Sequence, residues 1–175
     1  DGTYVTRWGS YGTGNSQFDY PYGIAVGPGG NIVVADTFNH RIQEFTPDGT
    51  YVTQWGSQGT GNGQFNYPDG IVAGPGGNFY IADYTNHRVQ EFTPDGTYVT
   101  QWGSGGNGNG KFIYPCGIAV SPVNGNVYVA DTYNHRIQAF TSDGTYVTRW
   151  GSYGTGNSQF RYPYGMAVSP VNGNV

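Results

Sequence analysis

Charged residues are scarce in this sequence, and their scarcity excludes several kinds of partner. Only 10% of the 175 residues are charged, Lys111 is the single lysine, and the formal net charge is −4. Proteins that bind nucleic acid neutralise phosphates with clusters of Lys and Arg, so we expect no nucleic-acid partner. No stretch reaches the roughly 18 consecutive apolar residues of a membrane span, and we expect no membrane insertion.

Helical periodicity is missing as well. Apolar positions alternate with polar ones in short runs rich in β-branched and aromatic residues, and 31 glycines and 10 prolines punctuate the chain. Alternation of this kind is typical of half-buried strands joined by tight turns. The composition therefore predicts an all-β protein.

What the sequence does contain is a repeat. The hexapeptide DGTYVT begins at Asp1, Asp48, Asp95 and Asp143, so the successive steps are 47, 47 and 48 residues. This period divides the segment 1–175 into repeats 1–47, 48–94 and 95–142 and an incomplete repeat 143–175. Self-similarity at such a period is typical of propellers and other repeat architectures.

Four strand-like runs separated by turn signals recur with this period. The first set comprises residues 23–27, 31–36, 40–45 and 50–56, and the pair Asp48-Gly49 suits the tight turn before the last run. A four-stranded antiparallel meander of about 40–50 residues is one propeller blade. The sequence predicts a β-propeller built of four-stranded antiparallel blades, with 175/47, or about 3.7, blades present.

The recurring motif resembles the NHL repeat. Asn-His-Arg occurs at 39–41, 86–88 and 134–136, preceded by VVAD, YIAD or YVAD and followed by IQ or VQ. The pattern GQFNYPDGIVA at 63–73 is similar to another part of the same repeat, although Arg stands where the family signature has Leu. The resemblance implies a six-bladed ring or a longer array. It also implies two activities found among related propellers, namely metal-dependent lyase or lactonase chemistry and RNA binding.

Each Asn-His-Arg motif follows an aspartate that ends the preceding run, and these aspartates are Asp36, Asp83 and Asp131. The arginine beyond the turn can return to the aspartate that precedes it or to the acid of the next blade. We interpret the pairs within one blade as turn-stabilising ion pairs with the histidines packed beside them, namely Asp36/Arg41, Asp83/Arg88 and Asp131/Arg136. The alternative is a metal ion shared by His40, His87 and His135. Metal ligands lie within about 2.1 Å of one ion, whereas equivalent positions on packed sheets are about 10 Å apart, so we expect no metal site.

One further repeated position supports a structural interpretation. A phenylalanine precedes each proline of the long inter-blade segment by three residues, at Phe18, Phe65, Phe112 and Phe160. We expect these rings to be buried between neighbouring blades, each contributing about 2 kcal/mol.

Cys116 is the only cysteine, so it cannot form an internal disulfide. It aligns with Tyr22, Asp69 and Tyr164 in the other repeats. A position this variable predicts a loop surface, and without basic neighbours the thiol should have no reactive role.

One rim of the predicted propeller should carry adaptable contact residues, because the inter-blade segments and the turns between the second and third runs share it. The candidates for binding a protein or a glycan are Tyr22, Asn39, His40, Arg41, Asn86, His87, Arg88, Asn134, His135 and Arg136. No catalytic elbow, HExxH motif or phosphate-binding loop occurs. We therefore expect no catalytic residues, no enzymatic activity and no cofactor.

These observations favour a non-enzymatic scaffold for protein or glycan binding, self-assembly, or both. A blade buries its faces only against neighbours, so we expect further blades of the same chain, or a homo-oligomer or filament, to cover the open ends. Low lysine content with abundant Gly, Tyr, Thr and Asn suggests an extracellular or cell-surface setting. The alternative is a metal-dependent, lyase- or lactonase-like enzyme that uses the central channel. Such an enzyme requires blade-specific residues, which are nearly absent from these repeats, and RNA binding requires a basic face.

Overall fold

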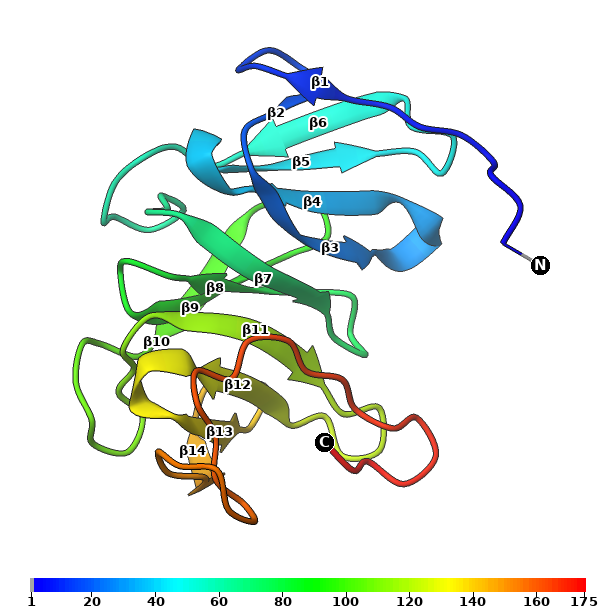
Figure 1. The fold of residues 1–175 in the computed structure, drawn as a ribbon. Helices are drawn as coiled ribbons and strands as arrows, with labels where there is room; N and C mark the ends of the chain where they lie inside the picture. Colours follow the sequence, from blue (N-terminus) through cyan, green and yellow to red (C-terminus); the bar gives the residue numbers. More distant parts are fainter. Residues whose placement is uncertain (1) are drawn as a thin grey trace.

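The computed structural model describes residues 2–175, which form three four-stranded antiparallel sheets (Figure 1). The first sheet contains β3 (Pro21–Val26), β4 (Ile32–Asp36), β5 (Arg41–Phe45) and β6 (Tyr51–Trp55). The second contains β7 (Pro68–Ala73), β8 (Phe79–Asp83), β9 (Arg88–Phe92) and β10 (Tyr98–Trp102). The third contains β11 (Pro115–Val120), β12 (Val127–Asp131), β13 (Arg136–Phe140) and β14 (Tyr146–Trp150). Within each of the three sheets every strand pairs with the next along the chain, which confirms the predicted all-β fold of meander blades.

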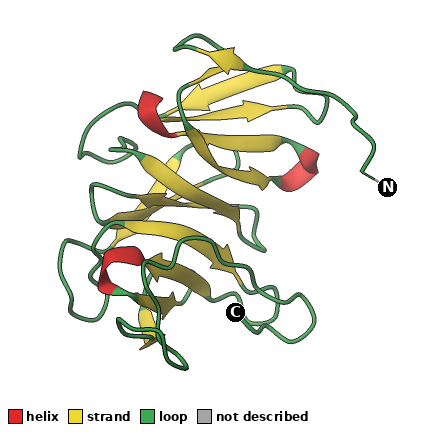
Figure 2. Cartoon of the chain, viewed as in Figure 1, coloured by secondary structure: helices red, strands yellow, loops and turns green. Residues whose placement is uncertain are grey.

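The remaining elements are short (Figure 2). A two-stranded parallel pair joins β1 (Ser10–Tyr11) to β2 (Gln17–Phe18) ahead of the first blade. Single 3-10 turns occur at η1 (Pro28–Gly30), η2 (Thr37–Asn39) and η3 (Thr132–Asn134). None of these helical turns within residues 2–175 is long and apolar enough to cross a membrane.

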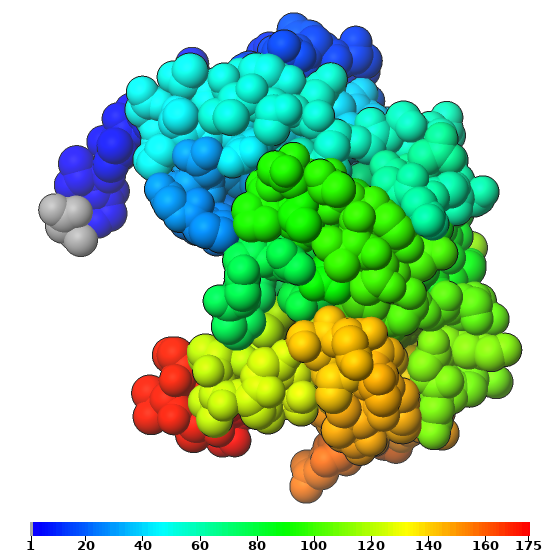
Figure 3. Space-filling model, turned by 180° about the vertical axis from the view of Figure 1, so that it is seen from behind, coloured from blue at the N-terminus to red at the C-terminus, as the bar shows by residue number. Residues whose placement is uncertain are grey.

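The blades form a fan in which the first strands β3, β7 and β11 lie next to one another (Figure 1). Viewed from behind, the molecule is a crescent whose N-terminal and C-terminal segments lie on either side of its open side (Figure 3). The sheets therefore surround a common axis without closing a ring within the described residues.

The first strand of each blade begins two residues earlier than the sequence predicts; β3 starts at Pro21, whereas the predicted run starts at residue 23. In β3, Pro21 pairs with Asp36, and the register shifts between Pro21 and Ile24. Proline is accepted at the first residue of an edge strand, because its missing N–H is not needed there. The same shift recurs in β7 and β11, so the start of every first strand is displaced in the same way.

Glycine permits the close approach of the first strands. A Cβ atom at Gly70 would overlap the carbonyl oxygen of Cys116 and lie 3.1 Å from the amide nitrogen of Ile118. A Cβ atom at Gly23 would likewise overlap the carbonyl oxygen of Asp69, and one at Gly117 would overlap that of Tyr164. The backbones around the axis are therefore packed directly against each other.

The core lies between the blades. One cluster joins Val33 and Ile42 of the first blade to Ile81 and Phe92 of the second, with Phe65 completely buried among them. Phe112 occupies the same place between the second and third blades.

The two outer phenylalanines are less enclosed. Phe160 is only partly buried, against a cluster formed by the third blade. Phe18 is half-buried, and its ring centroid lies 5.6 Å from that of Phe45 in the first blade. Burial at this repeated position therefore depends on having a blade on both sides.

The face of the first blade that points away from the second is open to solvent. Ile24 is 63% exposed, whereas its counterparts Ile71 and Ile118 are 6% and 7% exposed. Val26 is 64% exposed beside it. An apolar surface that neighbouring blades cover elsewhere is thus uncovered here.

Candidate functional site

A buried polar network holds each Asn-His-Arg turn against the loop that enters the same blade. At the end of β4, Asp36 accepts a hydrogen bond from Arg41 Nε over 2.8 Å, across the turn η2. Asn39 and Gln43 each donate to the same carboxylate over 3.0 Å. Arg41 also donates to the carbonyl oxygen of Gln17 in the loop over 3.0 Å. The network satisfies a buried carboxylate, which would otherwise be costly.

The network recurs in the other two blades. Asp83 pairs with Arg88 at 2.7 Å, and Asp131 pairs with Arg136 at 2.6 Å. All three ion pairs are formed within one blade, so the acid of the next blade is not the arginine's partner. Gln90 and Gln138 repeat the role of Gln43.

The arginines and asparagines of the motif are engaged inside the blade. Arg41, Arg88 and Arg136 are only 8%, 6% and 5% exposed. Each asparagine donates both to the aspartate and to a loop carbonyl, as Asn39 does to Gly12 over 2.9 Å, and Asn86 and Asn134 repeat these bonds. The burial of the three arginines differs from their expected place as rim contacts, because the buried carboxylate requires these donors, whereas the asparagines are only half-buried.

The buried glutamines Gln43, Gln90 and Gln138 were not singled out by sequence reasoning. They are completely buried, and the same glutamine recurs in the middle of every third strand, next to a buried apolar residue. That recurrence is the signal that could have identified them.

The histidines connect each blade to the entry of the next. Nδ1 of His40 accepts a hydrogen bond from the amide of Tyr67 over 3.0 Å, and His87 accepts one from Tyr114 over 3.0 Å. His135 repeats the contact with Tyr162. Burial lowers the pKa of His40 and His87, which favours the neutral imidazole that can accept this bond.

Aromatic rings form a belt along the rim. The tyrosine before each inter-blade proline adopts a positive φ of 47–58°, at Tyr20, Tyr67, Tyr114 and Tyr162. The centroid of Phe38 lies 4.9 Å from that of Tyr20 and 5.0 Å from that of Tyr67. Tyr133 lies 4.9 Å from Tyr114 and 5.1 Å from Tyr162. The left-handed backbone thus places rings from successive blades in contact.

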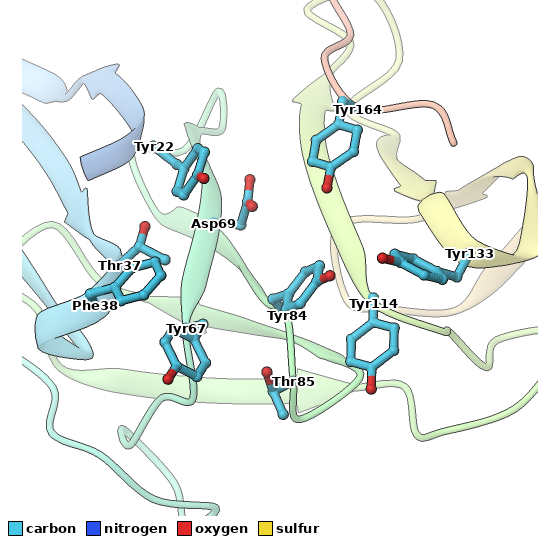
Figure 4. A pocket seen from close by; sticks show the side chains of 10 residues that line it. All are labelled: Tyr22, Thr37, Phe38, Tyr67, Asp69, Tyr84, Thr85, Tyr114, Tyr133 and Tyr164. Atoms are coloured by element: carbon cyan, nitrogen blue, oxygen red, sulfur yellow. The ribbon is translucent and has the colours of Figure 1, made fainter. Parts of the chain in front are cut away.

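These rings border a hollow of about 650 Å³ near the axis (Figure 4). Its lining consists of Tyr22, Thr37, Phe38, Tyr67, Asp69, Tyr84, Thr85, Tyr114, Tyr133 and Tyr164. Of the predicted rim candidates only Tyr22 is among them, and the motif's asparagines, histidines and arginines are not. Six of the ten lining residues are tyrosines, and Asp69 is the one charged member.

Residues that differ from blade to blade meet at this hollow. The second residue of the first strand is Tyr22 in the first blade, Asp69 in the second and Cys116 in the third. Asp69 is therefore a blade-specific residue that lines the hollow, although such differences are few among these repeats. The sequence showed the differences, but the convergence of their positions depends on the tertiary fold.

The turn after the second strand also differs in one blade. Thr37 and Thr132 donate to the carbonyl oxygens of Pro68 and Pro163 in the following segment, over 2.7 and 2.8 Å. In the second blade Tyr84 stands where the others have this threonine, and it lines the hollow beside Thr85 (Figure 4). Exchanging the order of two residues therefore puts the ring of this turn at the position where the other blades have the threonine.

Cys116 is completely buried, so the prediction of a loop-surface position was wrong. It belongs to β11, which packs directly against β7 at the axis. Burial raises the pKa of its thiol to about 12, so the thiol stays protonated.

Burial likewise raises the pKa of Asp69 to about 6, and a hydrogen bond from the Cys116 thiol partly opposes this shift. The carboxylate therefore titrates close to neutral pH, unlike an ordinary surface aspartate. Asp69 is therefore the lining group whose pKa lies near neutral pH.

Comparison with known proteins identifies the repeat. The model of the NHL repeat matches residues 18–45, 65–92 and 112–140. Each match begins at an inter-blade phenylalanine and ends with the third strand of the blade.

A stretch of 42 residues is 52% identical to the B-box type zinc finger protein ncl-1 of Caenorhabditis elegans, covering 24% of this chain and 5% of that protein. A stretch of the same length is 48% identical to Protein brain tumor of Drosophila melanogaster, covering 24% of this chain and 4% of that protein.

Solved structures show the same blade arrangement at low sequence identity. A streptogramin B lyase structure has a TM-score of 0.66 at 21% identity, covering 87% of this chain and 46% of the lyase. A catalytically inactive virginiamycin B lyase from Staphylococcus aureus, solved with quinupristin, has a TM-score of 0.64 at 23% identity, covering 85% of this chain and 46% of that chain. Kuenenia stuttgartiensis hydrazine synthase has a TM-score of 0.65 at 15% identity, covering 92% and 43%. The chain thus spans less than half the length of these structures, and the likeness concerns the fold.

Proposed function

Because this chain belongs to the NHL-repeat family of β-propellers, we propose that it is a non-enzymatic binding module for a protein or a glycan. The rim belt and the axial hollow form the contact surface in this proposal. The proposal includes an extracellular or cell-surface setting, which the composition supports. Measuring whether the parent protein is secreted tests this setting.

The observation that carries the proposal is a set of exposed aromatic rings on one face. Tyr20 is 65% exposed, Tyr22 61%, Tyr164 50% and Phe38 44%, all around the hollow. Tyr20 and Phe38 are in contact with each other, and rings that are already held in this way lose little conformational freedom when a partner packs on them. The hydroxyl groups of the tyrosines can also hydrogen-bond sugars or peptide groups.

The lining supports binding in preference to proton transfer. An enzyme that moves protons needs acid and base groups with matched pKa values in reach of the reacting atoms. Asp69 is one such group, but its ionisable neighbour Cys116 has a pKa raised by burial to about 12. Burial also raises the pKa of Tyr84 and Tyr164, which keeps these hydroxyls protonated.

Glycan and peptide arrays probed with the 175-residue chain test the binding proposal. The variant Tyr22→Ala/Tyr164→Ala removes two rings of the hollow, and Tyr4→Ala removes an even more exposed ring of the N-terminal segment as a control. Loss of two rings should weaken binding about tenfold or more, since each stacked ring contributes about 1 kcal/mol. No bound ligand for the parent chain, or equal binding by the two variants, would contradict the proposal.

Self-assembly is a second candidate function, and a separate observation favours it. Ile24 and Val26 form an uncovered apolar surface on the first blade, of the kind that other blades bury. Copies of near-identical blades can pair with one another across such surfaces.

A further inference from the structure

The axial hollow carries an unbalanced negative charge. Asp69 is the only charged side chain in its lining. Among residues 2–175, the ion pairs all belong to the three Asp-Arg networks, and none of them involves Asp69. A partly buried carboxylate without a cation raises the free energy of the folded state, so a positively charged ligand would gain from its neutralisation.

The rest of the lining suits a cation that is not strongly hydrated. Rings of Tyr22, Tyr84 and Tyr164 lie around Asp69 in the close view of the hollow (Figure 4). An aromatic face attracts an ammonium group through its quadrupole, and the attraction increases when water is excluded. Hard metal ions instead take several oxygen ligands, and the hollow offers a single carboxylate.

We propose that this hollow binds an organic ammonium group, with Asp69 as the counter-ion and the tyrosine rings as a surrounding cage. The inference rests on the proposed function and names the ligand chemistry of the same site. A volume of about 650 Å³ lies within the range of small-molecule sites and also admits a long side chain. The ammonium group can therefore come from a free amine or from a lysine side chain of a protein partner.

Ionisation of Asp69 gives the site a pH dependence. The carboxylate is charged above its pKa of about 6 and neutral below it. The groups that face it are the Cys116 thiol, whose pKa is raised to about 12, and the tyrosine hydroxyls of the lining. Asp69 is therefore the group of the lining whose charge changes between about pH 5 and 7.

Calorimetric titration of the 175-residue chain with choline and with n-butylammonium tests the proposal. Dimethylbutanol, the neutral isostere of choline, is the matched ligand control. Asp69→Asn removes the charge and keeps the shape, while Glu44→Gln removes a carboxylate of β5 that does not line the hollow. We expect at least one ammonium ligand to bind about tenfold more tightly than dimethylbutanol, and to lose that advantage in Asp69→Asn and below about pH 6 but not in Glu44→Gln.

A second titration separates the sources of the ammonium group. A peptide with one lysine is compared with the same peptide carrying norleucine, which has the apolar stem without the charge. Preference for the lysine peptide over n-butylammonium indicates a protein partner, and the reverse indicates a free amine. The proposal is overturned if every ammonium ligand binds no better than its neutral counterpart, or if Asp69→Asn binds as tightly as the parent. Tyrosine-dependent binding that survives in Asp69→Asn would leave the broader binding function standing.

Discussion

At the scale of single residues, Asp69 illustrates how a site opposes stability. Its pKa in the folded chain, about 6, lies above the ordinary value of 3.8. A group whose folded pKa is raised stabilises the fold below its unfolded pKa, and that contribution disappears as the pH rises through the folded value. Ionised Asp69 is therefore a cost to the folded chain at neutral pH.

We expect Asp69→Asn to raise the free energy of unfolding at pH 7 by about 1–2 kcal/mol, allowing for the partial exposure of the carboxylate. Urea unfolding between pH 4 and 7 measures the effect, and the gain should shrink towards pH 4, where both chains are neutral at this position. Glu44→Gln serves as the control for a lost carboxylate on another strand. Equal stability of Asp69→Asn and the parent at pH 7 would show that the carboxylate is well solvated.

Lack of space, and not the backbone angle φ, prevents a side chain at the position of Gly70. A methyl group there would overlap the carbonyl oxygen of Cys116 on the neighbouring first strand. Because both atoms belong to packed backbones, we expect Gly70→Ala to destabilise the chain by about 2–4 kcal/mol, in the range of severe overpacking. Gly76→Ala is the control, since no heavy atom lies within 4 Å of its Cβ position. Similar thermal midpoints for the two variants would contradict the packing of β7 against β11.

At the scale of elements, the predictable features are those set by local sequence. Asp36 and Arg41 are five residues apart on two strands joined by one tight turn, so the ion pair follows from the hairpin itself. The strands were predictable as well, because the alternation of apolar and polar residues is also a local property of the sequence. The hollow was not, because Tyr22, Asp69 and Tyr164 come from different repeats, and only the rotation between blades decides that they meet. Variability at Cys116 indicated a surface, whereas the position lies against the axis.

The junction between blades can be probed at its phenylalanine. Phe65 is completely buried between the first and second blades, whereas Phe18 is half-buried beside the first blade alone. We expect Phe65→Ala to cost about 3–4 kcal/mol, as for other buried phenylalanines, and Phe18→Ala clearly less. Chemical denaturation of both variants gives the comparison, and a larger loss for Phe18→Ala would reverse the inferred order of packing.

The histidine links should make the blade junctions sensitive to acid. Burial lowers the pKa of His40 and His87 below the ordinary value of 6.5, so they stabilise the fold above that pH and this stability is lost as the pH falls through their folded pKa. Protonation at Nδ1 also removes the acceptor of the Tyr67 and Tyr114 amides. We expect NMR titration in an Asp69→Asn background to give imidazole pKa values below 6.5, with faster exchange of those two amides in acid. Values at or above 6.5 would contradict the burial of these rings.

At the scale of the whole molecule, each blade is stabilised by its neighbours more than by itself. The buried clusters lie between sheets, and each inter-blade loop is pinned by the network of the blade it enters. Stability in such repeat arrays is approximately a sum of repeat and interface terms. A face that has no neighbour therefore loses a whole interface.

The uncovered face of the first blade predicts association of the 175-residue chain. Ile24 and Val26 are 63% and 64% exposed where the second and third blades bury the equivalent isoleucine. We expect light scattering at micromolar concentration to give a mass above the 18.9 kDa of one chain. Ile24→Lys should shift the population towards monomer, because a charge cannot be buried in an apolar interface without a partner. Val5→Lys, at an exposed valine of the N-terminal segment, should leave the mass unchanged, and a monomeric parent chain would contradict pairing through this face.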